Sequence, residues 1–156
     1  VVRLISAEDV LDIGRREAVI GIRNRRPHQR GLAGRRVGRI RFAAYSANAD
    51  VAVWARHKGN TPSADWLGKH VSDDRCIEVT SPRNALDLAL AGSAKALLPT
   101  FVGDGERRLV KVSETFEELD SDQWLVVHDD DRFSPEIRMT VDRIDELLRR
   151  LHRSHS

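Results

Sequence analysis

Four helix-start signals, each following a short apolar run, constrain the fold of this chain more than any other feature. Ser6-Ala-Glu-Asp is a capping-box pattern, in which the serine hydroxyl and the acid three residues later bind the first free amides of a helix. In the other three signals a hydroxyl residue precedes a proline: Thr61-Pro62, Ser81-Pro82 and Ser134-Pro135. Proline is tolerated at the first helical position because an amide there would have no partner. The pattern predicts four helices that alternate with strands.

Short β-branched and apolar runs mark the expected strands. We expect them at residues 1–5, 18–22, 37–45, 51–54, 75–80, 96–99, 109–112 and 123–128. The run Ala18 to Ile22 is continuously apolar, which is typical of a parallel strand buried on both faces. Alternating strands and helices predict an α/β fold with mainly parallel strands and right-handed crossovers.

The helices that the signals open differ in how clearly their lengths can be judged. The first should run from Ser6 to about Arg16, and the second from Thr61 to about His70. The last carries a single apolar stripe with spacings of 4, 3, 4 and 3, made by Ile137, Val141, Ile144, Leu148 and Leu151. The polar tail at residues 152–156 is expected to fray.

Composition indicates an ordinary globular protein of one or two units. Of the 156 residues, 40% are hydrophobic and 32% are charged, which is far from the composition of disordered chains. No window approaches 18 uncharged apolar residues, and charges at Arg3, Glu8 and Asp9 interrupt any signal-peptide pattern. The single cysteine, Cys76, reads as a buried or half-buried thiol in a strand. We therefore expect a cytoplasmic protein with no membrane association.

The net charge of +2 conceals a strong asymmetry along the chain. Residues 23–41 contain eight arginines and no acid, whereas acids dominate residues 104–136. A basic stretch can bind nucleic acid, but this one lacks interleaved aromatic residues and contains Gly31, Gly34 and Gly38. A solvated basic loop that leads into a strand is the favoured interpretation.

The sequence contains no pattern typical of an enzyme or a metal site. It lacks paired zinc-ligand spacings, a Gly-x-Ser-x-Gly motif, a phosphate-binding glycine loop and a dinucleotide fingerprint. His128 precedes three aspartates, but the spacing does not match an EF-hand, so a solvated turn is favoured over a cation site. We expect no catalytic residues, no metal and no cofactor. The tryptophans are assigned to packing, with Trp66 the one that could approach a ligand.

Four segments, in this order, resemble the effector-binding domain of LysR-type transcription regulators. They cover most of the chain: residues 10–24, with Leu11-Asp12-Ile13-Gly14 leading to Ile20-Gly21-Ile22-Arg23-Asn24; residues 32–45, with Leu32-Ala33-Gly34-Arg35-Arg36; residues 86–99, with Leu86-Asp87-Leu88-Ala89; and residues 123–138, with Gln123-Trp124-Leu125-Val126-Val127-His128.

The resemblance implies a two-subdomain fold of the periplasmic-binding-protein-like type 2 class, truncated at its N-terminus. Subdomain I would comprise residues 1–37 and 120–156, and subdomain II residues 38–119. The family's helix-turn-helix DNA-binding domain is absent from this chain. The first strand and first long helix of the sensor domain are missing as well, and the stretch after Tyr45 is short.

The function implied by the resemblance is ligand sensing in transcription regulation. A small organic effector, for which an anionic group is one option, would bind between the subdomains and control DNA binding by a separate winged helix-turn-helix domain. The implied partners are this effector and further copies of the chain, in a dimer or tetramer. DNA would be contacted only through the domain missing from this chain.

The candidate effector-binding residues lie at helix starts and at one strand end. Helix N-termini offer free amides and a positive dipole end, and α/β sheets bind ligands at the carboxyl ends of their strands. An arginine at such an edge can hold a carboxylate with two hydrogen bonds. The set is Ser6, Arg23, Asn24, Thr61, Pro62 and Ser63. Taken singly, each hydroxyl residue could serve only as a helix cap, and Arg23 could belong to the basic loop.

Two other functions remain open at this stage. A free-standing solute-binding protein would use the same fold, and an enzyme could be built on it as well. The sequence upstream of Val1 would distinguish them, because a helix-turn-helix marks a regulator and a signal peptide marks a solute-binding protein.

Overall fold

The chain folds into two units, which are described separately here. The computed structural model describes residues 3–5, 11–15 and 17–154. Contacts divide them into unit 1, which reaches Ile40 and resumes at Ser121, and unit 2, which comprises Arg41–Asp120. The sequence predicted crossings after residues 37 and 119, and the structure divides the chain after residues 40 and 120. The role of the units as effector-binding subdomains stays a prediction.

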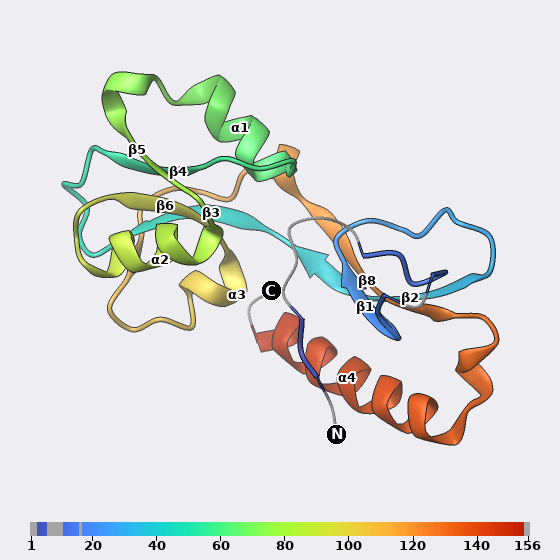
Figure 1. Ribbon diagram of the computed structural model, residues 1–156. Coiled ribbons are helices and arrows are strands. Elements are labelled where there is room, and N and C mark those ends of the chain that lie inside the picture. The colour runs from blue at the N-terminus through green and yellow to red at the C-terminus, as the bar shows by residue number, and fades with distance from the viewer. Residues whose placement is uncertain (1–2, 6–10, 16, 155–156) are drawn as a thin grey trace. The chain divides into compact units, whose positions relative to one another are not determined.

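Unit 1 is a three-stranded antiparallel sheet with one long helix (Figure 1). Its elements are β1 (Ile20–Arg23), β2 (Leu32–Ile40), β8 (Ser121–His128), the short 3-10 turn at Asp131–Phe133 and α4 (Pro135–Ser154). The strand order is β1-β8-β2, so the last strand in sequence lies between the first two. Residues from both ends of the chain therefore have to meet before this sheet can form.

The two faces of this sheet are covered by different parts of the chain. Gly21, Val126 and Gly34 form one row across the sheet. Ile13 covers this row at Gly21, where an added Cβ would lie 2.8 Å from its Cδ1 atom, and Pro27 covers it at Gly34, at 2.6 Å. Side chains alternate between the faces of a strand, so the neighbours of this row point to the opposite face, where α4 packs.

Unit 2 is a five-stranded mixed sheet with helices (Figure 1). Its strands are β3 (Phe42–Ser46), β4 (Trp54–His57), β5 (Cys76–Val79), β6 (Lys95–Pro99) and β7 (Val110–Lys111). Its helices are α1 (Pro62–His70), α2 (Pro82–Leu90) and α3 (Thr100–Gly103), with 3-10 turns at Asp73–Arg75 and Glu117–Leu119. The strand order is β5-β4-β6-β3-β7; β4 is parallel to β5 and β6, while β3 is antiparallel to β6 and β7.

Unit 2 contains both clusters of buried apolar side chains found among the described residues. One cluster is built around Tyr45 and Leu98, and the other around Leu67 and Leu97. Tyr45 is 1% exposed and packs over Gly103, where an added Cβ would lie 2.4 Å from the ring. Burial, reinforced by the hydrogen bond that its hydroxyl donates to Asp104, raises the pKa of Tyr45 above its usual range.

The prediction of mainly parallel strands is wrong. Unit 1 is wholly antiparallel, and only the β5-β4-β6 part of unit 2 is parallel. Residues 18–22 were expected to form a strand buried on both faces, but β1 lies at the edge of its sheet and Ile22 is 51% exposed. A continuous apolar run signals partial burial, but it carries no information on the direction of the neighbouring strand.

The N-terminal expectations are corrected where the structure describes them. Residues 3–5 form no strand, and Leu4 is 92% exposed. The predicted helix at 6–16 is absent over residues 11–15, which form a turn closed by the amides of Arg15 and Glu17 on the Asp12 carbonyl. The remainder of that predicted helix lies outside the described residues.

The basic stretch is only partly a loop. Strand β2 begins at Leu32 and includes Arg35, Arg36 and Arg39, so the second half of the stretch pairs with β8. The single strand expected at 37–45 is instead two strands of different sheets, which separate at Arg41. The strand expected at 51–54 lies at 54–57.

The helix-start signals at three of the four sites are confirmed. Helices α1, α2 and α4 each begin with the predicted proline, and the side chains of Thr61 and Ser81 cap the first two. Strands at β5, β6, β7 and β8 lie where they were expected. The prediction that residues 152–156 fray is wrong at His152, which lies within α4 and is 8% exposed. None of the described helices is long and apolar enough to cross a membrane.

Candidate functional site

Unit 2 places two helix N-termini at one edge of its sheet. Strands β4 and β5 are parallel and in register, with His57 opposite Val79, so their carboxyl ends meet at the same edge. Helix α1 follows β4, and helix α2 follows β5. Because β4 ends at His57, the link to Thr61 is shorter than the sequence suggested. This edge has the geometry in which α/β folds bind ligands.

The start of α1 is a compact group of hydroxyls around Thr61. The Thr61 Oγ1 atom accepts a hydrogen bond from the Ala64 amide at 3.2 Å, which caps the helix. The same atom lies 3.2 Å from the Ser63 hydroxyl and 3.5 Å from His57 Nε2. Ser63 is 8% exposed. The cap therefore orients a second hydroxyl and an imidazole beside the helix start.

The first turn of α1 has a donor left for a ligand. The first amides of a helix lack intrahelical partners. Pro62 has no amide hydrogen, and the amide of Ala64 is taken by Thr61, so Ser63 carries the remaining amide of this turn. The positive end of the helix dipole adds to the attraction for an anion at this point.

His57 is a feature of this edge that the sequence did not reveal. It is the last residue of β4 and only 5% exposed. Its 3.5 Å separation from the Thr61 hydroxyl is longer than the roughly 2.6–3.2 Å expected between a nucleophile and its base. Thr61 is also committed to capping, so this geometry favours binding over nucleophilic catalysis.

In unit 1, Arg23 and Asn24 lie at the end of β1, as predicted. The Arg23 Nη2 atom donates to the Leu11 carbonyl at 2.7 Å, which anchors one side of the guanidinium within the chain. On the sheet, Arg23 lies opposite Trp124, on the face away from α4. The arginine is therefore held in place by the turn that precedes β1.

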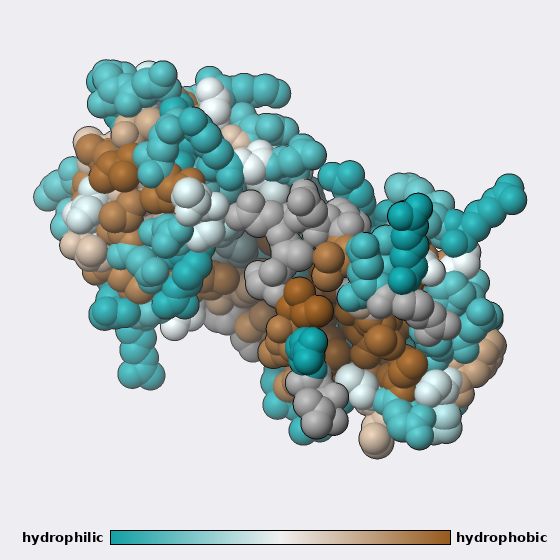
Figure 2. All heavy atoms as spheres, in the orientation of Figure 1, coloured by the Kyte–Doolittle hydropathy of each residue, from teal (hydrophilic) through white to brown (hydrophobic). Residues whose placement is uncertain are grey.

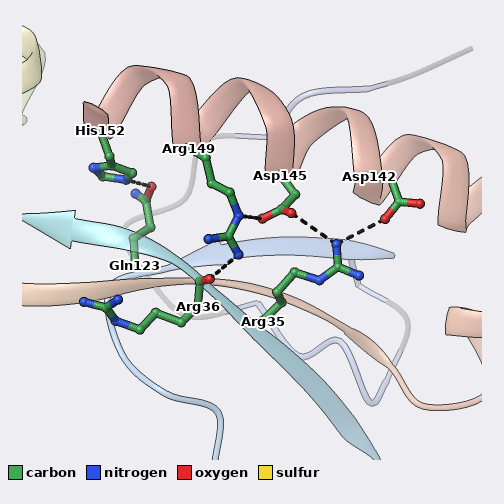
Figure 3. A network of polar contacts seen from close by, with 7 residues as sticks. All are labelled: Arg35, Arg36, Gln123, Asp142, Asp145, Arg149 and His152. Carbon is green, nitrogen blue, oxygen red and sulfur yellow. Dashed lines mark hydrogen bonds and ion pairs between the residues drawn. The ribbon is translucent and has the colours of Figure 1, made fainter. Parts of the chain in front are cut away.

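Asn24 belongs to a chain of polar groups that continues into the interior of unit 1. Its Oδ1 atom accepts a hydrogen bond from Gln123 Nε2 at 3.4 Å. The other end of the same amide, Gln123 Oε1, lies 3.0 Å from His152 Nε2 (Figure 3). The ring of His152 rests on Gly38, where an added Cβ would lie 2.1 Å from its Cδ2 atom.

Arg35 of β2 pairs with acids that are distant in sequence (Figure 3). Arg35 Nη1 lies 3.1 Å from Asp142 Oδ1 and 3.2 Å from Asp145 Oδ2, both on α4. Arg149 donates to Asp145 at 2.9 Å and to the backbone carbonyl of Arg36 at 2.8 Å. The contacts of Arg35 with the two aspartates, led by the Asp142 hydrogen bond, raise the pKa of Arg35. The side chain of Arg35 and the backbone of Arg36 therefore attach α4 to the sheet.

The predicted site residues fall into two groups. Arg23 and Asn24 belong to unit 1, whereas Thr61, Pro62 and Ser63 belong to unit 2. Ser6 lies outside the described residues. The structure brings the members of each group together, and their convergence on one effector stays a prediction.

The metal-binding side chains and the single cysteine were the remaining candidates for chemistry in the described residues. No group of three or more metal-binding side chains occurs within the part of the chain that the structure describes. Cys76 is half-buried at the start of β5, with its sulfur 3.6 Å from the Asp73 carbonyl. The His128–Asp130 contact of 3.5 Å lies in the turn after β8, where the Asp130 side chain is exposed.

Comparison with known proteins shows similarity in structure but not in sequence. No family model and no curated protein sequence matches the chain. Among solved structures, the AmpR effector-binding domain from Citrobacter freundii superposes with a TM-score of 0.64 at 14% identity, covering 92% of this chain and 81% of that one. The regulatory domain of CrgA, a LysR-type transcriptional regulator from Neisseria meningitidis, gives a TM-score of 0.62 at 17% identity, covering 86% and 77%.

A full-length regulator is matched over about half of its length. The LysR-type regulator LysG from Corynebacterium glutamicum, with its effector Arg bound, gives a TM-score of 0.58 at 12% identity, and the match covers 88% of this chain but 53% of LysG. The expected two-sheet α/β class is thus confirmed. The chain has the periplasmic-binding-protein-like type 2 fold of LysR-type effector-binding domains.

Proposed function

We propose that this chain is the ligand-sensing domain of a LysR-type transcription regulator, which binds a small organic effector. The observation that carries the proposal is the fold, which matches regulatory and effector-binding domains over most of the chain. The start of α1 and the end of β1 supply groups suited to binding: a free helix amide, one buried and one half-buried hydroxyl, and an arginine. Effector binding would then control DNA binding by a separate winged helix-turn-helix domain.

The first experiment is a ligand screen by thermal shift and calorimetry. The panel contains small carboxylates, aromatic acids and amino acids; the last class is included because LysG is described with bound Arg. A ligand that binds the folded state raises the melting temperature by mass action. We expect at least one anionic member to do so. If no compound shifts the melting temperature at millimolar concentration, the sensing function is contradicted.

The role of Arg23 is tested by the variant Arg23→Ala. A lost charge-assisted contact is expected to weaken the affinity for a carboxylate ligand by about tenfold or more. The matched control is Arg138→Ala, which removes an exposed arginine of α4. An unchanged affinity in Arg23→Ala, equal to that of the control, would remove this residue from the site.

Thr61 has a capping role and a proposed binding role, and a matched pair of variants separates them. Thr61→Val and Ser81→Ala each remove a side-chain cap from the first turn of a unit 2 helix, at a cost of about 1 kcal/mol. Both variants should therefore lose similar stability. We expect only Thr61→Val to lose affinity for the effector. Equal affinities in the two variants would assign Thr61 to capping alone.

The remaining parts of the proposal concern assembly and location. We propose that the chain self-associates as a dimer or tetramer, acts in the cytoplasm and contacts DNA only through a domain outside this sequence. Light scattering coupled to gel filtration measures the first part directly. A monomer at all concentrations, with or without effector, would contradict it.

A further inference from the structure

Gln123 links a buried histidine to an exposed asparagine within unit 1. Gln123 and His152 are each 8% exposed, while Asn24 is exposed at the end of β1. The two ends of the Gln123 amide contact different partners, with Oε1 toward His152 Nε2 at 3.0 Å and Nε2 toward Asn24 Oδ1 at 3.4 Å. A side chain held at both ends cannot change one contact without changing the other.

The two ends of an amide have opposite hydrogen-bonding character. The oxygen only accepts, and the NH₂ group only donates. A charged imidazole donates from both ring nitrogens, so it requires the Gln123 oxygen, and the NH₂ group then donates to Asn24. A neutral imidazole has one donor and one acceptor. When its Nε2 atom is the acceptor, the Gln123 amide is reversed and its oxygen faces Asn24.

We propose that the charge of His152 sets, through Gln123, whether Asn24 presents its oxygen or its NH₂ group at the surface. The proposal rests on the sensing function only for its consequence: at the effector site, the two states would favour ligands with different hydrogen-bonding groups. Gln123 and His152 would then be positioning residues that act through Asn24. The effector affinity of the domain would then depend on the charge of His152, although His152 does not touch the ligand.

The surroundings of His152 act on its pKa in opposing directions, and the net effect lowers it. Burial is the largest cause and lowers the pKa of His152; a hydrogen bond with the Arg39 backbone opposes this, and the charge of Arg36 lowers the pKa further. The last turn of a helix also favours a cation. The charged or titratable side chains on the elements around the ring come from three elements. They are Arg35, Arg36 and Arg39 of β2, Asp122 and His128 of β8, and Glu136, Arg138, Asp142, Arg143, Asp145, Glu146, Arg149, Arg150 and Arg153 of α4.

Two of the nearby acids are already paired. Asp122 lies 2.8 Å from Arg36, and Asp145 lies 2.9 Å from Arg149. The Gln123 oxygen is the acceptor that the structure places next to the Nε2 atom of His152.

The test is an NMR titration of the chain without any effector, from about pH 8 to about pH 4.5, a range that brackets an ordinary histidine. The ring protons of His152 and the side-chain amides of Asn24 and Gln123 are followed together. We expect the Asn24 amide to shift along a one-proton curve with the same midpoint as the His152 ring.

Two variants make the test specific. Gln123→Met keeps the length of the side chain and removes both hydrogen-bonding groups, so His152 should still titrate while the Asn24 shift at that midpoint disappears. The side chain of Gln123→Glu can only accept hydrogen bonds when it is ionised, so this variant should also lose the Asn24 shift. It replaces Gln123→Met in the test if the methionine variant does not fold. The proposal is overturned if Asn24 keeps its response in either folded variant, or if either residue of the unaltered chain shows no titration.

The outcome is independent of the proposed function. Coupled titration with no ligand found in the screen would leave the polar link intact and remove the sensing role. Ligand binding without coupled titration would support the sensing role and contradict the polar link.

Discussion

The two units of this chain are stabilised in different ways. Unit 2 closes its core with apolar side chains, and both buried apolar clusters lie in it. Unit 1 attaches α4 with ion pairs and hydrogen bonds, and the apolar stripe of that helix is only half-buried. Of the nine large apolar side chains that are exposed in the described residues, seven belong to unit 1: Leu4, Ile5, Val19, Ile22, Phe133, Met139 and Leu147.

The difference shows that unit 1 depends more on contacts between distant segments, and less on apolar burial, than unit 2 does. Figure 2 shows apolar side chains gathered on the side of unit 1 that carries β1. Less of the apolar surface in this unit is removed from water, so apolar burial contributes less to its stability. Unit 1 depends instead on contacts between its two chain segments, which are separated by the whole of unit 2.

The largest effect is expected from a cavity in unit 2. Leu67 is fully buried, so Leu67→Ala should lower the free energy of unfolding by about 2–5 kcal/mol. The matched variant Leu148→Ala removes a half-buried side chain of α4 and should cost about half as much. Urea unfolding followed by circular dichroism measures both. Equal losses would mean that the two units are packed alike.

A glycine pair gives the next largest effect. Gly38→Ala places a Cβ 2.1 Å from the His152 ring, and the resulting displacement should cost about 1–3 kcal/mol. The control is Gly68→Ala in α1, where no atom lies within 4 Å of the added Cβ. A helix interior favours alanine over glycine, so this variant should gain up to about 1 kcal/mol. The same urea experiment applies, and a neutral Gly38→Ala would show that the His152 contact is loose.

A smaller effect is expected from pH, and it should arise in unit 1. Because burial lowers the pKa of His152 in the folded state, the unfolded chain binds more protons between that pKa and the ordinary value of 6.5. The contribution of neutral His152 to the free energy of unfolding is therefore complete above about pH 6.5, and it is lost as the pH falls toward the pKa of the folded state. Unfolding measured at several pH values should show this loss in the unaltered chain and a flatter profile in His152→Gln. Identical pH profiles for the unaltered chain and His152→Gln would contradict a role of His152 in the pH dependence.

The smallest effect is expected from an exposed ion pair. The side chains of Arg35 and Asp142 are 49% and 54% exposed, so Asp142→Asn should change the free energy of unfolding by less than about 0.5 kcal/mol. Asp145 is 16% exposed and contacts two arginines, so Asp145→Asn should cost more. Repeating the unfolding experiment in high salt should reduce both effects, since salt screens exposed charges. A larger loss for Asp142→Asn would reverse the ranking.

The sequence was informative where one segment contains the whole cause of its structure. The hydroxyl and proline at Thr61-Pro62 and Ser81-Pro82 satisfy or remove the amides of their own first turn, and both helices begin where predicted. Arg23 and Asn24 follow the same logic, because their position depends only on where β1 ends.

The sequence was uninformative where a structure depends on a partner far along the chain. Residues 11–15 carried a helical pattern, yet the structure shows a turn there whose Ile13 packs on the sheet at Gly21. His57 gave no signal beyond its place near a strand end, since its contact with Thr61 requires the turn between them.

Three of the four helix-start signals, at Thr61, Ser81 and Ser134, thus define what local chemistry alone determined: the helix boundaries at 62, 82 and 135 and the α/β class. Tertiary structure decided the antiparallel pairing of unit 1, the ion pairs of Arg35 with acids more than 100 residues away, and the link from Asn24 through Gln123 to His152. The physical reason is that a helix cap satisfies backbone groups within a few residues. A strand edge or a buried amide is satisfied only by whichever segment the completed fold places beside it.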